Sequence, residues 1–279
     1  MKTPYTLGEI RKLIADNPND PPYSALFYDP IDIALQKPDN ESYDQRHEKI
    51  AAYMMQKEIH AARDLFLSAD IKLLNSDRGI LVDSAFTVQL GEMKDNSKTG
   101  QAQLDAIFNQ FEAVKAAEGC IMVINNNASR NSPSWFAAVW GGIMSNSTCQ
   151  LGCNGVITNG FVRDQAQLDA MASDFNYLIF GKGNCALDAR GHIRIDYYQD
   201  AIQMPGLDFG FRKKNLVAVN PGDLMVADRD GTIVIPKAIA REVLELSIER
   251  YKAEKYIVGG IRAQNRHNVI PFIKEHGIL

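Results

Sequence analysis

Arg163 and Asp164 are an adjacent cation and anion at the end of a long uncharged segment. Residues 131–162 contain no Asp, Glu, Lys or Arg but many Ser, Asn, Thr and Gly residues. Such a segment is expected in the centre of a domain or at a subunit contact, and its polar content excludes a membrane span. Ligands of open α/β sheets bind beyond the carboxyl ends of strands. A strand, the turn Asn159-Gly160 and then two charges therefore predict a ligand site, and a surface ion pair is the alternative interpretation.

Two glycines, Gly141 and Gly142, stand at a predicted helix start just upstream. Backbone N–H groups at such a position can point at an anion without obstruction by side chains. A small carboxylate held by these amides beside Arg163, with a metal ion on Asp164, would form a compact site. Taken alone, however, the two glycines are better explained by close helix packing.

The elements that must position these residues alternate between strand and helix. Strands are expected over residues 79–90, 120–124, 155–158 and 177–180, and helices over 104–117, 135–147 and 165–173. This order predicts an α/β layer with parallel strand pairing. Further strands are expected at 192–198, 216–219, 224–228 and 232–235, followed by a helix from Pro236 to about Arg266 and a short helix over 271–277.

Residues 1–75 lack the alternation of strand and helix patterns and are expected to form a helical N-terminal extension to a domain of residues 76–279. The run 41–70 has helical spacing of apolar residues. Asn17–Pro22 is expected to be a loop, because its three prolines do not fit inside a helix. This part of the chain is interpreted as an arm or cap.

The composition is that of a globular protein. Of the 279 residues 46% are hydrophobic and 23% charged, with a net charge of −4, which argues against nucleic-acid binding and against disorder. No signal peptide or membrane span is recognised, so a cytoplasmic protein is expected. The four cysteines, Cys120, Cys149, Cys153 and Cys185, are expected to be reduced, without a zinc site.

Two segments resemble the RraA-like family, which contains the regulator of ribonuclease activity A and class II pyruvate aldolases. They are residues 141–164, ending in Gly-x-x-Arg-Asp, and 220–236, a Pro-Gly-Asp-x-x-x-Ala-Asp-x-x-Gly hairpin. The resemblance covers roughly residues 75 to 279. It implies a swivelling β/β/α-type layered domain around a mixed sheet, and a homotrimer or a dimer of trimers.

The resemblance also implies roles for particular residues. Asp164 would be the direct protein ligand of Mg²⁺ or Mn²⁺, and Arg163 would contact the keto oxygen of a substrate and stabilise an enolate. The substrate carboxylate would be held by the amides of the four residues Gly141, Gly142, Ile143 and Met144. Glu254 matches an acidic position that reaches a neighbouring subunit's site, and Asp188 lies in a recurrent segment of the family.

Two functions follow. The first is a metal-dependent lyase, an aldolase or decarboxylase that cleaves a C–C bond of a 2-keto acid through a pyruvate enolate. The second is a non-catalytic regulatory binding protein. Asp164 favours the lyase, whereas Gly142, which stands where the aldolases carry an acid, favours the regulator. Asn159 and Asn125–Asn127 also replace acidic or glycine-rich family positions. A methyltransferase is rejected, because no glycine-rich dinucleotide-type loop follows an early strand.

Overall fold

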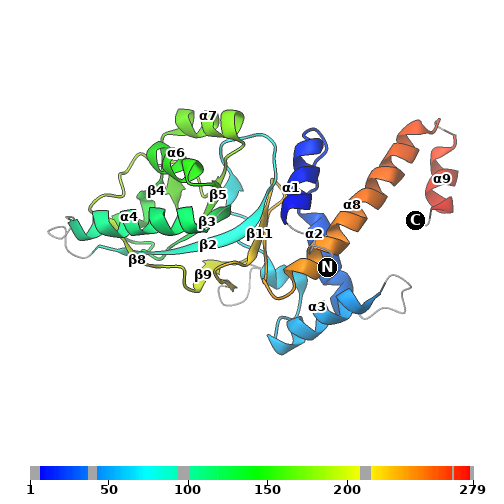
Figure 1. The fold of residues 1–279 in the computed structure, drawn as a ribbon, viewed down its shortest axis with the longest axis horizontal. Helices are drawn as coiled ribbons and strands as arrows, with labels where there is room; N and C mark the ends of the chain where they lie inside the picture. Colours follow the sequence, from blue (N-terminus) through cyan, green and yellow to red (C-terminus); the bar gives the residue numbers. More distant parts are fainter. Residues whose placement is uncertain are drawn as a thin grey trace.

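The computed structural model describes residues 7–36, 43–93, 101–117, 119–207, 215–265 and 267–276, and of residues 101–108 only the backbone. Figure 1 shows a sheet-containing lobe at one end of the molecule and a helical lobe at the other. Gly277, the expected end of the last helix, lies outside the described residues.

The main sheet combines a parallel centre with antiparallel edges. Its strands are β1 (Lys72–Leu73), β2 (Leu81–Glu92), β3 (Cys120–Asn126), β5 (Cys153–Thr158), β7 (Leu178–Gly181), β8 (Ile193–Tyr198), β11 (Leu224–Ala227) and β12 (Thr232–Ile235). They lie in the order β1-β7-β5-β3-β2-β11-β12, and β8 also pairs with β2. The four neighbours β7, β5, β3 and β2 are parallel. The expected mixed, layered α/β fold is thus confirmed.

Alternation along β3 assigns its two faces to different layers. Met122 and Ile124 pack in one apolar cluster with residues of α7 (Gln165–Phe175), while Ile121 and Val123 pack in another with the β9–β10 hairpin. β9 (Ile202–Pro205) and β10 (Leu216–Val219) pair with each other outside the main sheet. Helices α4 (Gln101–Ala116), α6 (Gly142–Gln150) and α7 lie on the same side of the sheet in Figure 1, and β9 lies on the other.

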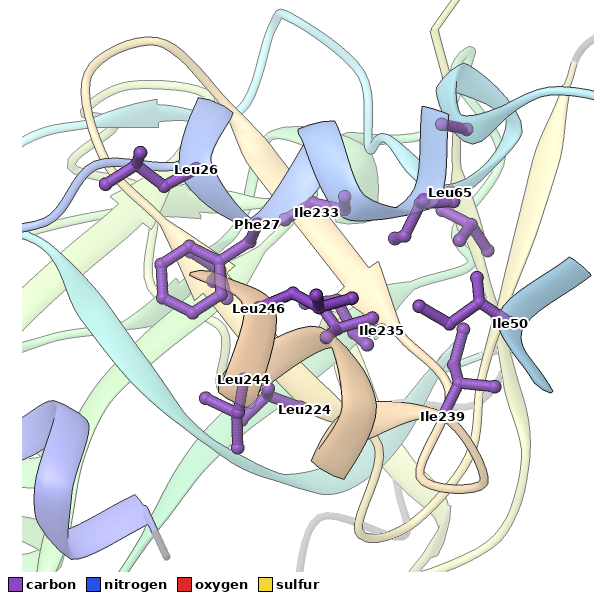
Figure 2. Packing of buried hydrophobic residues seen from close by; sticks show 14 of the residues in the cluster. Leu26, Phe27, Ile50, Leu65, Leu224, Ile233, Ile235, Ile239, Leu244 and Leu246 are labelled. Carbon is purple, nitrogen blue, oxygen red and sulfur yellow. The ribbon is translucent and has the colours of Figure 1, made fainter. Parts of the chain in front are cut away.

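The helical lobe brings the beginning and the end of the chain together. It contains α1 (Leu7–Asp16), α2 (Ala25–Gln36), α3 (Gln45–Gln56), the 3₁₀ turn η1 (Ala62–Leu65), α8 (Ala240–Ala263) and α9 (Val269–Glu275). Figure 2 shows Phe27 of α2 and Ile50 of α3 packed among Ile235 of β12 and Leu246 of α8. The N-terminal helices therefore cover a face that β11, β12 and α8 would otherwise expose. The division into residues 1–75 and 76–279 stays a prediction.

Two expectations for local structure need correction. The helical spacing of 41–70 corresponds to the shorter α3 and to η1, because the chain leaves the helix after Gln56. The helix expected over 135–147 is interrupted: the four-residue α5 (Pro133–Phe136) is followed by β4 (Ala138–Trp140) and then by α6. Pairing of β4 with β6 (Phe161–Val162), which is distant in sequence, overrides the local helical preference.

Candidate active site

The two short parallel strands β4 and β6 place the predicted site residues side by side. Ala138 pairs with Phe161 and Trp140 with Val162, so Gly141 and Arg163 follow neighbouring strand ends. The Arg163 N–H donates a hydrogen bond to the Trp140 carbonyl oxygen at 3.0 Å. Arg163 and Asp164 thus follow β6 in a separate two-stranded ribbon, and not the buried strand β5 of the main sheet.

Asp164 links the two chain segments. Its Oδ2 accepts the N–H of Gly142 at 3.0 Å and lies 3.8 Å from Nε of Arg163. Its backbone is left-handed, with φ 65° and ψ 41°, a conformation that Asp and Asn adopt more readily than most residues. A Cβ atom at Gly141 would lie 2.6 Å from Oδ2 of Asp164. The close approach of this carboxylate therefore explains why residue 141 is glycine.

The start of α6 provides backbone donors next to these charges. Gly141 is the N-cap of α6 and Gly142 is its first residue, which agrees with the helix start inferred at the two glycines and not with the helix expected over 135–147. Within the described part of the chain, the N–H groups of Ile143 and Met144 have no hydrogen-bond acceptor, as is usual for the first turn of a helix. The Ile143 side chain is 78% exposed. This helix end can therefore accept an anion from solvent.

Asp188 holds the guanidinium of Arg163 in place. Its Oδ2 lies 2.9 Å from Nη1 of Arg163 and 2.6 Å from Nη2 of Arg190. Hydrogen bonds from Arg190, and then from Arg163, hold the pKa of the Asp188 carboxyl well below its usual range. Asp188 therefore remains ionised and fixes one edge of the Arg163 guanidinium.

The donor set fits a divalent ion held mainly by water and substrate. Asp164 presents a partly exposed carboxylate, and only its Oδ2 is engaged by other described groups. Within the described ranges no three His, Cys, Asp or Glu residues gather as a metal-binding group. Mg²⁺ commonly binds through one or two carboxylates with substrate and water completing its shell. A single carboxylate is compatible with that mode and incompatible with a protein-enclosed metal.

Glu254 does not join this group within one chain. It lies on α8, and its Oε2 accepts a 2.5 Å hydrogen bond from the Tyr23 hydroxyl. Burial and this hydrogen bond raise the pKa of Tyr23. In Figure 1, α8 stands in the helical lobe, away from α6 and α7. Any role of Glu254 at a site formed by Arg163 and Asp164 requires a second copy of the chain.

One residue at the site was not anticipated from the sequence. A Cβ atom at Gly142 would lie 1.7 Å from Oε1 and 3.1 Å from Cβ of Gln167. Gln167 of α7 thus occupies the space that a side chain at residue 142 would need. The sequence predicts that Gln167 lies on a helix. Only the packing of α6 on α7 shows that its side chain faces Gly142.

The chain belongs to the RraA-like family, described as Aldolase/RraA, whose profile it matches over residues 57–234. It is 31% identical over 108 residues to an uncharacterized protein of Methanocaldococcus jannaschii, covering 39% of this chain and 45% of that protein. It is 26% identical over 134 residues to protein DlpA of Legionella pneumophila, covering 48% of this chain and 19% of that protein. The chain thus spans less than half the length of both relatives.

Solved structures share the fold at low identity. An uncharacterized protein from Pseudomonas syringae pv. tomato has a TM-score of 0.53 at 20% identity, covering 88% of this chain and 96% of its own. RraAS2 of Streptomyces coelicolor, described as an unusual member of the RNase ES inhibitor RraA family, has a TM-score of 0.51 at 16% identity, covering 81% and 94%. A structure described as one of novel cellulases from gut-associated microbes has a TM-score of 0.55 at 20% identity, covering 90% and 98%.

None of the helices in the described ranges is long and apolar enough to cross a membrane.

Proposed function

We propose that the protein is a divalent-metal-dependent lyase that cleaves a C–C bond of a 2-keto acid through a pyruvate enolate. The family contains both aldolases and regulators. The observation that carries the proposal is the meeting of Arg163, Asp164 and the uncapped amides of α6 at one place. A cation, a metal-competent carboxylate and an anion-binding helix end are the groups that such a substrate requires.

The chain's own residues would divide the work between binding and charge stabilisation. The amides of Ile143 and Met144 would bind the carboxylate of the 2-keto acid. Arg163, fixed by Asp188 at 2.9 Å, would donate to the keto oxygen as negative charge develops there. Asp164 would hold Mg²⁺ or Mn²⁺, which as a Lewis acid neutralises charge on the carboxylate and keto oxygens of the substrate.

The assembly is part of the proposal. Ile143 and Phe175 are 78% and 54% exposed on α6 and α7, and the adjoining sequence carries no charge over residues 131–162. Such a surface favours contact with another subunit. We propose a homotrimer or a dimer of trimers in which Glu254 of one copy approaches the site of another. Light scattering that gives a monomer at micromolar concentration would contradict this.

The test compares the wild type with variants on two substrates, oxaloacetate and 4-hydroxy-4-methyl-2-oxoglutarate, with Mg²⁺ and with EDTA. Asp164→Asn is preferred to alanine, because asparagine tolerates the left-handed backbone at this position. It should abolish metal-dependent turnover. Arg163→Lys should lower the rate by about 10²–10³-fold, because lysine cannot present the planar fork. Asp174→Asn, an exposed change on the same helix, should leave the rate unchanged. Equal turnover by Asp164→Asn and the wild type would exclude a lyase that depends on a metal ion held by Asp164.

A regulatory binding protein is the second candidate, and the Gly142–Gln167 contact favours it. Gln167 fills the place where an acid at residue 142 would stand, so the chain lacks the acid that the family's aldolases carry there. If the purified protein turns over neither substrate with Mg²⁺, the regulatory function replaces the lyase.

A further inference from the structure

A cavity of about 490 Å³ opens at the carboxyl ends of the four parallel strands of the main sheet. Gln89 lies near the end of β2. The segment Asn125–Arg130 contains the last two residues of β3 and the four residues after it, and Asn159 and Lys182 follow β5 and β7. Four neighbouring strands thus each contribute polar residues to one cavity. This is where open α/β sheets bind their ligands, and the volume is in the range of small-molecule sites.

This cavity is separate from the site of Arg163 and Asp164. Trp135, which lines it, precedes β4, whereas Gly141 follows β4. Phe136 and Phe161 stack at the amino ends of β4 and β6, with ring centroids 5.9 Å apart. The three residues of β4 span about 10 Å at the usual rise per residue of a strand. None of the residues 141–144, 163, 164 and 188 lines the cavity.

The wall of the cavity is a connected set of buried side-chain amides. Asn159 donates through Nδ2 to Oδ1 of Asn125 at 2.7 Å, and Asn125 donates through Nδ2 to Oε1 of Gln89 at 3.0 Å. Oδ1 of Asn159 accepts the backbone N–H of Asn126 at 2.6 Å. Gln89, Asn125, Asn126 and Asn159 are each at most 6% exposed. Nε2 of Gln89 and Nδ2 of Asn159 each donate twice within the protein, so the wall offers a ligand the second N–H of Asn125 and the remaining lone pairs of the amide oxygens.

Two cations and an aromatic ring stand at the same cavity. Nζ of Lys182 lies 3.8 Å, and the guanidinium carbon of Arg130 5.4 Å, from the ring centroid of Trp135. In the part of the chain that the structure describes, no carboxylate lies within 4.0 Å of the Arg130 guanidinium. The lining also includes the carboxylate of Asp196, which is paired with Nε of Arg194 at 2.6 Å.

We propose that this cavity is a second ligand site, specific for a small polyhydroxylated anion such as a sugar acid or a sugar phosphate. The anionic group would bind Arg130 and Lys182, which lie over the ring of Trp135, and the hydroxyl groups of the ligand would bond to the amide wall. The neutral sugar lacks an anionic group for the two cations, and inorganic phosphate lacks the further hydroxyl groups for the amides. The proposal does not depend on the lyase function.

Trp135 makes the site measurable. The chain has two tryptophans, and Trp140 is 2% exposed on β4 beyond the cavity, so ligand-induced changes in fluorescence report on Trp135. The full chain is titrated with gluconate, glucose 6-phosphate, glucose and inorganic phosphate, and calorimetry repeats each titration. At least one of the two charged sugars should bind with a Kd below roughly 1 mM. Binding of gluconate alone assigns a carboxylate ligand, and binding of glucose 6-phosphate alone a phosphorylated one.

Variants separate this site from the other one. Arg130→Gln, an exposed change, should weaken binding about tenfold through the loss of a charge-assisted hydrogen bond. Lys252→Gln on α8 and Arg163→Lys should leave the Kd unchanged. Absence of binding by both charged sugars, equal binding of glucose, or an unchanged Kd in Arg130→Gln would each overturn the proposal. Weakened binding in Arg163→Lys would instead place the ligand at the first site and overturn it equally.

Discussion

The carboxylate of Asp188 lies 2.9 Å from the guanidinium of Arg163, although 25 positions separate the two residues in the sequence. The chain returns to the site because Ala138 of β4 bridges to Asp188 on one side while it pairs with Phe161 of β6 on the other. Asp188 is thus held by backbone pairing and in turn holds Arg163. We regard it as a positioning residue for the cation of the site.

Asp188→Asn should lower turnover about tenfold while the protein remains folded. The neutral amide keeps the shape but loses the charge-assisted hydrogen bond to Arg163, so the guanidinium is no longer fixed toward the substrate. The loss should fall mainly on kcat for oxaloacetate, and Asp188→Glu should recover part of it. Asp174→Asn serves as the matched control on an exposed carboxylate of α7. An unchanged kcat would show that Arg163 does not need this partner.

Gly142→Asp should destabilise the protein and should be rescued by a second change. The new Cβ would meet Gln167, with Oε1 at 1.7 Å and Cβ at 3.1 Å, and moving the glutamine end alone does not relieve the second contact. We expect a loss of about 1–3 kcal/mol in the free energy of unfolding. The double variant Gly142→Asp, Gln167→Ala should recover most of it. Urea denaturation of both variants and of Gln167→Ala alone measures the coupling.

The same pair tests the choice between the two functions. If an acid at residue 142 is what the chain lacks, the double variant should cleave the 4-hydroxy-2-keto acid faster than Gln167→Ala does. Equal rates in the two variants would show that the missing acid does not limit aldol cleavage.

Local patterns predicted most of the main sheet, because its strands are short apolar runs between turn residues. The expected strands at 120–124, 155–158 and 232–235 correspond to β3, β5 and β12. The local patterns also indicated a helix start at Gly141–Gly142, and they drew attention to the adjacent charges Arg163 and Asp164 after a glycine turn. What they could not show is β4, whose pairing with β6 depends on residues more than twenty positions away.

The residues that meet at the cavity and beside α8 show the same limit of local sequence patterns. Asn125–Asn127 and Asn159 are recognisable as departures from family positions, but the joining of Asn125 and Asn159 in one buried amide wall follows from the parallel register of β3 and β5. The position of Glu254 beside Tyr23 depends on the contact between the N-terminal extension and α8. Periodicity predicts the helix that carries Glu254, but it does not reveal that this helix meets Tyr23, which precedes α2.

Arg11→Ala should lower the free energy of unfolding by about 2 kcal/mol. Arg11 of α1 forms an ion pair with Asp83 of β2, whose side chain is fully buried, and so ties the N-terminal extension to the sheet. Without Arg11, the buried carboxylate of Asp83 keeps only the side-chain amide of Asn154 and the backbone N–H of Ser84 as described hydrogen-bond donors. Lys12→Ala, an exposed change one residue away, should have little effect. Reversible urea denaturation of both variants provides the comparison, and equal stability would mean that water replaces the arginine.

Acid should destabilise the helical lobe through His47. Burial lowers the pKa of this side chain, and the nearby Asp44 only partly opposes the effect. Its imidazole is therefore neutral in the folded state at pH values where the unfolded chain, with a pKa of about 6.5, already binds a proton. The unfolded state binds more protons in that interval, so stability falls as the pH drops below about 6.5 and levels off once the folded pKa is passed. Urea denaturation at pH 7.5 and 5 should show a smaller difference for His47→Gln than for the wild type, whereas His60→Gln, an exposed change, should keep the full difference. A His47→Gln protein with the wild-type pH dependence would assign the acid sensitivity to other groups.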